Sequence, residues 1–164
     1  MSQFVVTSGG TMTNLNERRS PSRTAALTGT TYPVGTVLTS LEQRPVFINA
    51  SNGVVASTEV WHRLGTNRWV NESTGSPSTG GVIRNMIRTT KFNNPQAFSV
   101  SSSTGEANVR RGPGSVFTRV RILRNGTKLI GTHTATPPSG FPLSTGGAWI
   151  RIGNREWIYR PLIR

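Results

Sequence analysis

The stretch WHRLGTNRWV at residues 61–70 decides the fold, because it returns as WIRIGNREWI at residues 149–158. Both copies follow the pattern W-x-R-h-G-x3-W-h, in which h is an aliphatic residue. All four tryptophans of the chain fall on this pattern at matching positions, which chance rarely produces. The pattern therefore indicates an internal repeat, in which one small module is used twice.

The repeat continues upstream of the tryptophans. Residues 16–22 (NERRSPS) correspond to residues 108–114 (NVRRGPG), and residues 34–38 (VGTVL) correspond to residues 125–129 (NGTKL). The motifs follow the same order in both halves, while the offset between copies drifts from 92 residues at the prolines to 88 at the tryptophans. Such a drift is typical of a duplication whose loops have since gained or lost residues.

Apolar and β-branched residues alternate or cluster between glycine-rich stretches, which predicts strands and hairpins. The second tryptophan motif is typical of a hairpin over residues 149–159 with its turn at residues 153–156, and the first half has a matching hairpin over residues 59–70. Asn125 and Gly126 form the dipeptide that most favours a tight hairpin turn. The sequence therefore predicts an all-β fold.

A stretch rich in Ser, Gly and Thr at residues 73–81 has the composition of a linker. Residues 82–88 (VIRNMIR) then place apolar residues at positions i, i+1, i+4 and i+5, which favours a short helical turn over an extended strand. We predict three segments: a first repeat over residues 1–72, a linker with this short helix over residues 73–96, and a second repeat over residues 97–164.

The charge of the chain is strongly positive. Lys and Arg number 19 against 6 Glu and no Asp, which gives a formal net charge of +13. A field of this size attracts polyanions such as nucleic acid, the anionic polymers of a Gram-positive wall or an anionic membrane surface. Arginine, which dominates, also makes bidentate contacts with phosphate and carboxylate. The alternative is that the basic residues only keep a β-rich protein soluble.

The composition excludes several classes of site. The chain has no cysteine, so it has no disulfide framework, thiolate zinc site or cysteine nucleophile. His62 and His133 are the only histidines, there is no Asp to orient a catalytic triad, and no H-E-x-x-H motif is present. We therefore expect no catalytic residue, no metal site and no cofactor, and we expect that the protein is not an enzyme.

No apolar run is long enough to span a bilayer, and residues 1–10 lack the pattern of a signal peptide. An extracellular location would then require cell lysis, a phage particle or a larger parent protein.

Residues 107–164 resemble the bacterial Src-homology-3-like domain through the motifs ANVRRGP, RNGTKL, WIRI and a final WI. Residues 13–71 resemble it more weakly, because Glu17 and Arg18 stand where a Val-Arg pair is expected and the loop over residues 40–57 is long. The tryptophan hairpins are also similar to those of surface-layer-associated wall-binding modules of lactobacilli. Together the resemblance covers about three quarters of the chain.

The resemblance implies two small, strongly bent antiparallel Src-homology-3-like barrels in tandem. Such barrels attach secreted enzymes, phage lysins or surface proteins to bacterial cell walls. We therefore expect a non-catalytic module, located at the cell wall, that binds peptidoglycan or an anionic wall glycopolymer through two repeated sites. A lysin, a surface protein or a phage structural protein would be its partner. The alternative is a structural or assembly protein, such as a phage virion component, whose basic surface binds nucleic acid or another protein.

Two arginine pairs, Arg18-Arg19 and Arg110-Arg111, occupy equivalent places in the two repeats. By the resemblance, this place is the long first loop of each barrel. A groove between this loop and a tryptophan would stack a sugar or peptide and pair with its carboxylate or phosphate. Trp69 and Trp157 are predicted to be core residues, whereas Trp61 and Trp149 fit a core position and a ligand contact equally well. The candidate ligand-binding residues are Arg18, Arg19, Trp61, Arg63, Arg110, Arg111, Trp149, Arg151 and Tyr159.

Overall fold

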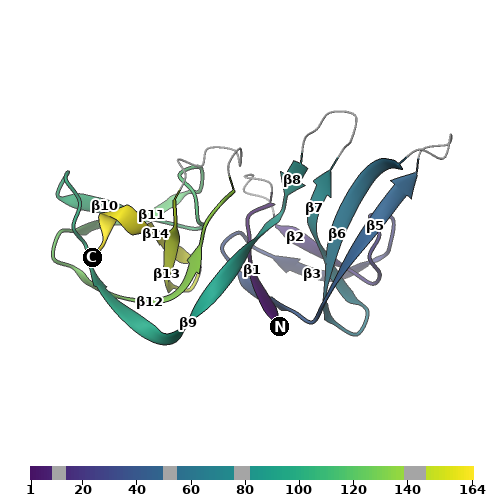
Figure 1. The fold of residues 1–164 in the computed structure, drawn as a ribbon, viewed down its shortest axis with the longest axis horizontal. Coiled ribbons are helices and arrows are strands. Elements are labelled where there is room, and N and C mark those ends of the chain that lie inside the picture. The colour runs from purple at the N-terminus through teal and green to yellow at the C-terminus, as the bar shows by residue number, and fades with distance from the viewer. Residues whose placement is uncertain (9–13, 50–54, 76–81, 139–146) are drawn as a thin grey trace.

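The computed structural model of the chain is built from antiparallel strands (Figure 1). It describes residues 1–8, 14–49, 55–75, 82–138 and 147–164. The strands are β1 (Ser2–Val6), β2 (Leu15–Arg18), β3 (Leu27–Tyr32), β4 (Val37–Ser40), β5 (Glu42–Asn49), β6 (Val55–Gly65), β7 (Arg68–Gly75), β8 (Val82–Arg84), β9 (Met86–Ser99), β10 (Glu106–Arg110), β11 (Arg119–Arg124), β12 (Lys128–Ala135), β13 (Trp149–Gly153) and β14 (Glu156–Tyr159). A short 3₁₀ helix, η2, covers Arg160–Leu162. No α-helix is present in these ranges, so the all-β prediction is confirmed.

Two sheets organise the strands. One has eight strands in the order β11-β10-β14-β13-β12-β9-β1-β4, and the other has the order β3-β2-β7-β6-β5 with β8 paired to β7. Strand β9 pairs with β12 of the second half and with β1 of the first half. Figure 1 shows β9 running from one half of the molecule to the other. The arrangement agrees with two small antiparallel barrels, which here share one strand.

The helical turn predicted for residues 82–88 is wrong, because the segment is extended as β8 and the start of β9. The pairing of β9 with β1 explains why the apolar pattern misled. Met86 faces the core of the first half and Ile87 faces the core between the halves, so adjacent apolar residues are buried on opposite faces of one strand. Residues 76–81 of the predicted linker lie outside the described residues, and the three-segment division of the chain stays a prediction.

The repeat extends further than the sequence motifs indicate. The amide of Val6 donates to the carbonyl of Thr36 and its carbonyl accepts from the amide of Gly35, both at 2.9 Å. Val100 makes the same two bonds to residues 126–127, at 2.9 and 3.0 Å. The first strand of each half is therefore held to the same turn in the same way, which places β1 and the end of β9 in equivalent positions.

A hydrophobic core joins the halves. Its buried residues come from both sides of the molecule: Val5, Val34, Ile87, Phe117, Ala135, Trp149 and Trp157. Around it, the guanidinium of Arg155 donates to the carbonyl of Val34 at 2.8 Å, and the backbone at Gly35 lies directly against the carbonyl of Arg111. The shared strand and this junction core together fix the halves relative to each other.

Candidate ligand-binding site

The first arginine of each pair holds the loop that follows it. The guanidinium of Arg18 donates to the carbonyl of Ala25 at 2.7 Å, and that of Arg110 donates to the carbonyl of Phe117 at 2.8 Å. Both guanidinium groups are half-buried. The recurrence of the pair across the repeat thus follows at least in part from a structural demand of the loop.

The second arginines differ from each other. Arg19 is exposed, whereas Arg111 is half-buried at the junction with the first half, beside Gly35. Burial lowers the pKa of the neighbouring Arg155, and the charge of Arg111 lowers it further. Two cations are therefore held close together at the junction.

All four tryptophans are buried, which confirms the core prediction for Trp69 and Trp157. Trp61 is 1% exposed and Trp149 is 5% exposed. Any ligand contact by either indole is therefore limited to a small edge of the ring.

A pocket of about 150 Å³ in the second half brings together three of the candidate residues. Its wall consists of Asn108, Arg110, Ser115, Trp149, Tyr159 and Leu162, which we call the aromatic pocket. The rings of Trp149 and Tyr159 lie 5.4 Å apart, centroid to centroid, at a tilt of 46°. An aromatic wall formed by Tyr159 and the edge of Trp149, beside amide, hydroxyl and guanidinium groups, suits a small polar ligand such as a sugar or a peptide.

The charge of Arg110 makes this pocket electropositive. Burial lowers the pKa of Arg110, and the neighbouring charge of Arg119 lowers it further. No ion pair of the described residues neutralises Arg110. The aromatic pocket therefore favours a ligand with an acceptor or a negative charge at this point.

The corresponding place in the first half is filled by the protein itself. The indole of Trp61 donates to a carboxylate oxygen of Glu59 at 2.7 Å, and Arg23 of the neighbouring loop pairs with the same carboxylate. Glu59 is buried and lies two residues before the tryptophan, where the second half has Gly147. Among the described residues the two copies of the predicted groove thus differ, because Glu59 and Arg23 occupy the first, whereas the second lines a pocket.

Arg63 and Arg151 also differ in their partners. Arg63 donates to the carboxylate of Glu42 at 2.7 Å across the β5–β6 ladder. In the second half, His133 stands opposite Arg151, whose guanidinium donates only to the carbonyl of Gly153, at 3.2 Å, among the contacts described. Burial lowers the pKa of Arg151. The second half thus keeps the cation and replaces its carboxylate with an imidazole.

Glu17 departs from the Val-Arg pattern of the second repeat, and the structure shows what replaces the missing apolar contact. Its buried carboxylate accepts hydrogen bonds from Tyr32 at 2.5 Å, Thr28 at 2.8 Å and Arg68 at 3.0 Å. Burial by itself would raise the pKa of Glu17, but these three donors outweigh it and hold the pKa below its ordinary value. In the second repeat, Val109 occupies this position and is fully buried.

A chain of polar contacts in the first half joins residues that lie far apart in the sequence and follow no motif. Nδ1 of His62 lies 2.7 Å from the hydroxyl of Ser40, and Nε2 lies 2.6 Å from the carboxylate of Glu72. These are the residue types of a hydrolase triad. However, Ser40 is 5% exposed and His62 is 1% exposed, and the Ser40 hydroxyl donates to the carbonyl of Glu42 at 2.9 Å. We interpret the chain of contacts as a satisfied buried polar network.

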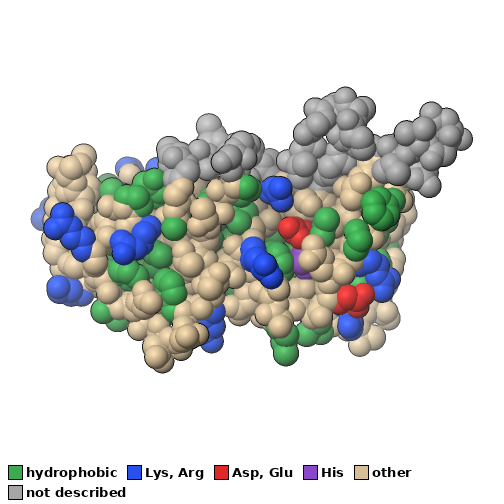
Figure 2. Space-filling model, in the orientation of Figure 1, with side chains coloured by type: hydrophobic (Ala, Val, Ile, Leu, Met, Phe, Trp, Pro, Cys, Tyr) green, Lys and Arg blue, Asp and Glu red, His purple; other side chains and the backbone are tan. Residues whose placement is uncertain are grey.

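Charge is unevenly divided between the repeats. Residues 97–164 hold ten Lys and Arg against two Glu, whereas residues 1–72 hold six Arg against four Glu. Figure 2 shows acidic side chains only over the first half on the face it presents. No group of three or more metal-binding side chains occurs in the described parts of the chain, and none of their helices is long and apolar enough to cross a membrane.

Neither protein-family models nor curated proteins match the sequence. Among solved structures, the crystal structure of Ly7917 shares 12% identity over 71% of this chain and 56% of its own, with a TM-score of 0.30. The crystal structure of Ly7917 with the hydrolyzing product of MDP shares 14% identity over 96% of this chain and 56% of its own, with a TM-score of 0.33. The chain thus spans little more than half the length of these structures, and similarity this weak supports no functional argument.

Proposed function

We propose that this protein is a non-catalytic binding module that attaches to a bacterial cell-wall polymer, either peptidoglycan or an anionic wall glycopolymer. The observation that carries the proposal is the aromatic pocket, in which Arg110, Trp149 and Tyr159 meet beside the loop that follows β10. Its aromatic surface, which Tyr159 and the edge of Trp149 provide, matches together with its polar groups the chemistry of amino sugars and short peptides. The concentration of positive charge in the same half favours a wall rich in phosphate or carboxylate.

The proposal contains one open site rather than the two repeated sites expected from the sequence. Glu59 and Arg23 fill the counterpart in the first half, so attachment there would require this ion pair to open. The first half instead holds the aromatic pocket in place, because Val5 and Val34 pack with Trp149 in the junction core.

A pull-down on purified Gram-positive walls tests the proposal. We expect retention of the full chain at moderate salt, and a loss of affinity of about tenfold on Tyr159→Ala, because an aromatic contact at the centre of a site typically dominates binding. Asn108→Ala should also weaken retention. Asn16→Ala is the matched control, since Asn16 is exposed at the equivalent position of β2. Absence of retention, or equal loss in the Asn108 and Asn16 variants, would refute wall binding at this pocket.

The second candidate function is binding of nucleic acid by the basic surface of the second half. Exposed cations follow β11 and the turn after it: Arg119, Arg121, Arg124 and Lys128. Such a surface predicts an affinity for DNA that falls steeply and linearly with the logarithm of the salt concentration. Walls, walls stripped of teichoic acid, and DNA compared side by side separate the two candidates, because only wall binding should respond to Tyr159→Ala.

The non-catalytic part of the proposal has its own test at Ser40. A fluorophosphonate probe labels serines that an adjacent base activates. We expect no labelling of the native protein, because the Ser40 hydroxyl is buried and bonded to the carbonyl of Glu42. Mass spectrometry of the intact protein provides the measurement. Labelling that disappears in Ser40→Ala and in His62→Gln would instead identify a hydrolase site.

A further inference from the structure

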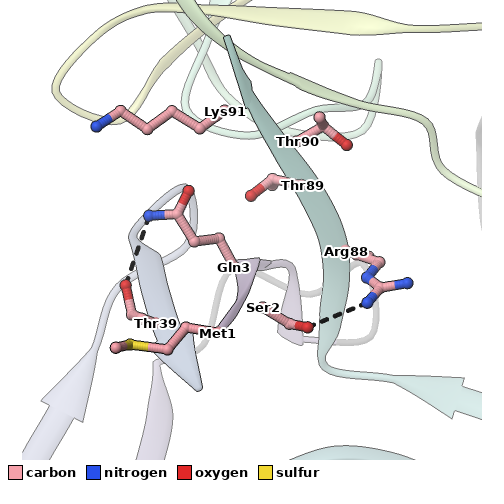
Figure 3. A pocket seen from close by; sticks show the side chains of 8 residues that line it. All are labelled: Met1, Ser2, Gln3, Thr39, Arg88, Thr89, Thr90 and Lys91. Carbon is pink, nitrogen blue, oxygen red and sulfur yellow. Dashed lines mark hydrogen bonds between the residues drawn. The ribbon is translucent and has the colours of Figure 1, made fainter. Parts of the chain in front are cut away.

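A second pocket, of about 520 Å³, lies where β9 leaves β1 (Figure 3). Residues of three neighbouring strands line it, among them Thr39 of β4, Gln3 of β1, and Thr89 and Lys91 of β9. We call this pocket the β9 cleft. Figure 3 shows Thr89 and Lys91 on the same side of β9, with Arg88 and Thr90 on its opposite side. The β9 cleft is separate from the aromatic pocket, with which it shares no lining residue.

A row of basic side chains begins in the β9 cleft and continues across the sheet. Lys91 of β9 stands opposite His133 of β12, which stands opposite Arg151 of β13. Residues opposite one another in a ladder project from the same face of the sheet. Lys91, His133 and Arg151, which we call the basic row, therefore lie on one face.

The basic row has no counterion among the described residues. No described ion pair includes Lys91 or Arg151. Burial lowers the pKa of His133, and the charges of Arg151 and Lys91 lower it further, so both cations act on the middle of the row. In the first half, the same ladder position pairs Arg63 with the carboxylate of Glu42 at 2.7 Å. Replacement of Glu42 by His133 in the second repeat thus leaves positive charge uncompensated.

The hydroxyl of Thr89 provides an independent observation at the same place. Thr89 is 6% exposed, and its hydroxyl oxygen has no hydrogen-bond partner among the described residues. Buried polar groups are rarely left unpaired, so an unpaired one next to a pocket indicates a missing partner. On the neighbouring strands β1 and β4, the amide of Gln3 and the hydroxyl of Thr39 lie 3.5 Å apart in a weak bond that a ligand can replace.

We propose that the β9 cleft binds a phosphate group carried by a sugar or polyol. Lys91, the member of the basic row that lines the cleft, supplies charge for the phosphate, and lysine is a common point-charge partner of phosphate oxygens. Thr89, Gln3 and Thr39 supply neutral hydroxyl and amide groups for sugar hydroxyls. The volume of about 520 Å³ is in the range of pockets for small molecules. This inference does not depend on wall binding by the aromatic pocket.

Calorimetric titration of the full chain with glucose 6-phosphate tests this inference, with glucose and inorganic phosphate as separate arms. We expect glucose 6-phosphate to bind more tightly than either part, because the cleft offers both charged and neutral partners. Lys91→Ala should weaken the binding at least roughly tenfold, the usual effect of removing a charged hydrogen-bond donor. Lys128→Ala changes the net charge equally at the other, exposed lysine and should leave the affinity unchanged.

A second variant separates a loss of binding from a loss of folding. His133→Glu recreates the arrangement of Glu42 and Arg63, which the first half already tolerates, and should abolish binding while the protein stays folded. Equal losses in the Lys91 and Lys128 variants, undiminished binding by His133→Glu, or no binding of glucose 6-phosphate would each overturn the proposal. DNA binding that depends on Lys91 while glucose 6-phosphate does not bind would also overturn it. The Tyr159→Ala variant should bind the sugar phosphate normally, so failure of one proposal is distinguishable from failure of the other.

Discussion

Glu17 and Val109 occupy the same place in the two repeats, yet one is a carboxylate and the other an aliphatic side chain. Neither residue is accessible to solvent beyond 1%. The first repeat tolerates the buried charge because Tyr32, Thr28 and Arg68 all donate to it. Replacing the carboxylate with an amide removes the charge and one of its two acceptor oxygens, so at least one of the three donors loses its partner, which costs more than an unmade surface bond.

Glu17→Gln is therefore expected to lower the free energy of unfolding at pH 7 by about 1–3 kcal/mol. Because the folded-state pKa of Glu17 is lowered, the carboxylate stabilises the fold fully above its unfolded pKa and loses this effect as the pH falls through the lowered value. Urea unfolding at neutral and acidic pH measures both effects, and the difference between variant and native protein should shrink in acid. Glu106→Gln, at an exposed position of β10, should change stability by less than about 0.5 kcal/mol. A difference that persists in acid would contradict this account.

The turns before β4 and before β12 are equivalent elements with different surroundings. Gly35 has φ +86° and Gly126 has φ +84°, so both require the left-handed region that favours glycine. A Cβ at Gly126 would meet no atom within 4 Å, whereas one at Gly35 would overlap the carbonyl oxygen of Arg111 in the second half. The turn at Gly126 thus has open space beside it, whereas the equivalent turn at Gly35 packs against Arg111 of the other repeat.

Gly126→Ala should cost about 1–2 kcal/mol, the price of a left-handed conformation for a residue with a Cβ. Gly35→Ala should cost about 1–3 kcal/mol more, because the junction must also shift to relieve the overlap. Denaturant unfolding of both variants gives the comparison. Equal destabilisation would show that the junction at Arg111 yields without loss of stability.

The sequence predicts the elements that occur in both repeats, but it does not predict the strand pairing between the two halves. The two tryptophan hairpins, β6–β7 and β13–β14, have registers that match residue by residue, and their motif predicted them. The apolar spacing over residues 82–88 predicts a helical turn where the structure has a strand, because only the pairing with β1 reveals that both faces of this segment are covered. The aromatic pocket was predicted in part, through Arg110, Trp149 and Tyr159. The filling of its first-half counterpart by Glu59 depends on side-chain contacts between segments and has no signal in the motif.

At the scale of the whole molecule, the sequence repeat and the folded unit do not coincide. The repeat divides the chain into two similar lengths, but β9 is hydrogen-bonded to β1 on one side and to β12 on the other. The junction core also takes residues from both repeats. Neither repeat is therefore complete without a contribution from the other, which explains how two small modules with modest cores can form one stable body.

The shared strand β9 has a mechanical consequence. A force that pulls the two halves apart is transmitted along the covalent backbone of β9, rather than only across the side chains of the junction. Separation would then require the ladders on either side of β9 to slide in shear, with several hydrogen bonds loaded at once, instead of opening one bond at a time like a zipper. If one half were bound to a surface while the other half was pulled, β9 would carry the load between them.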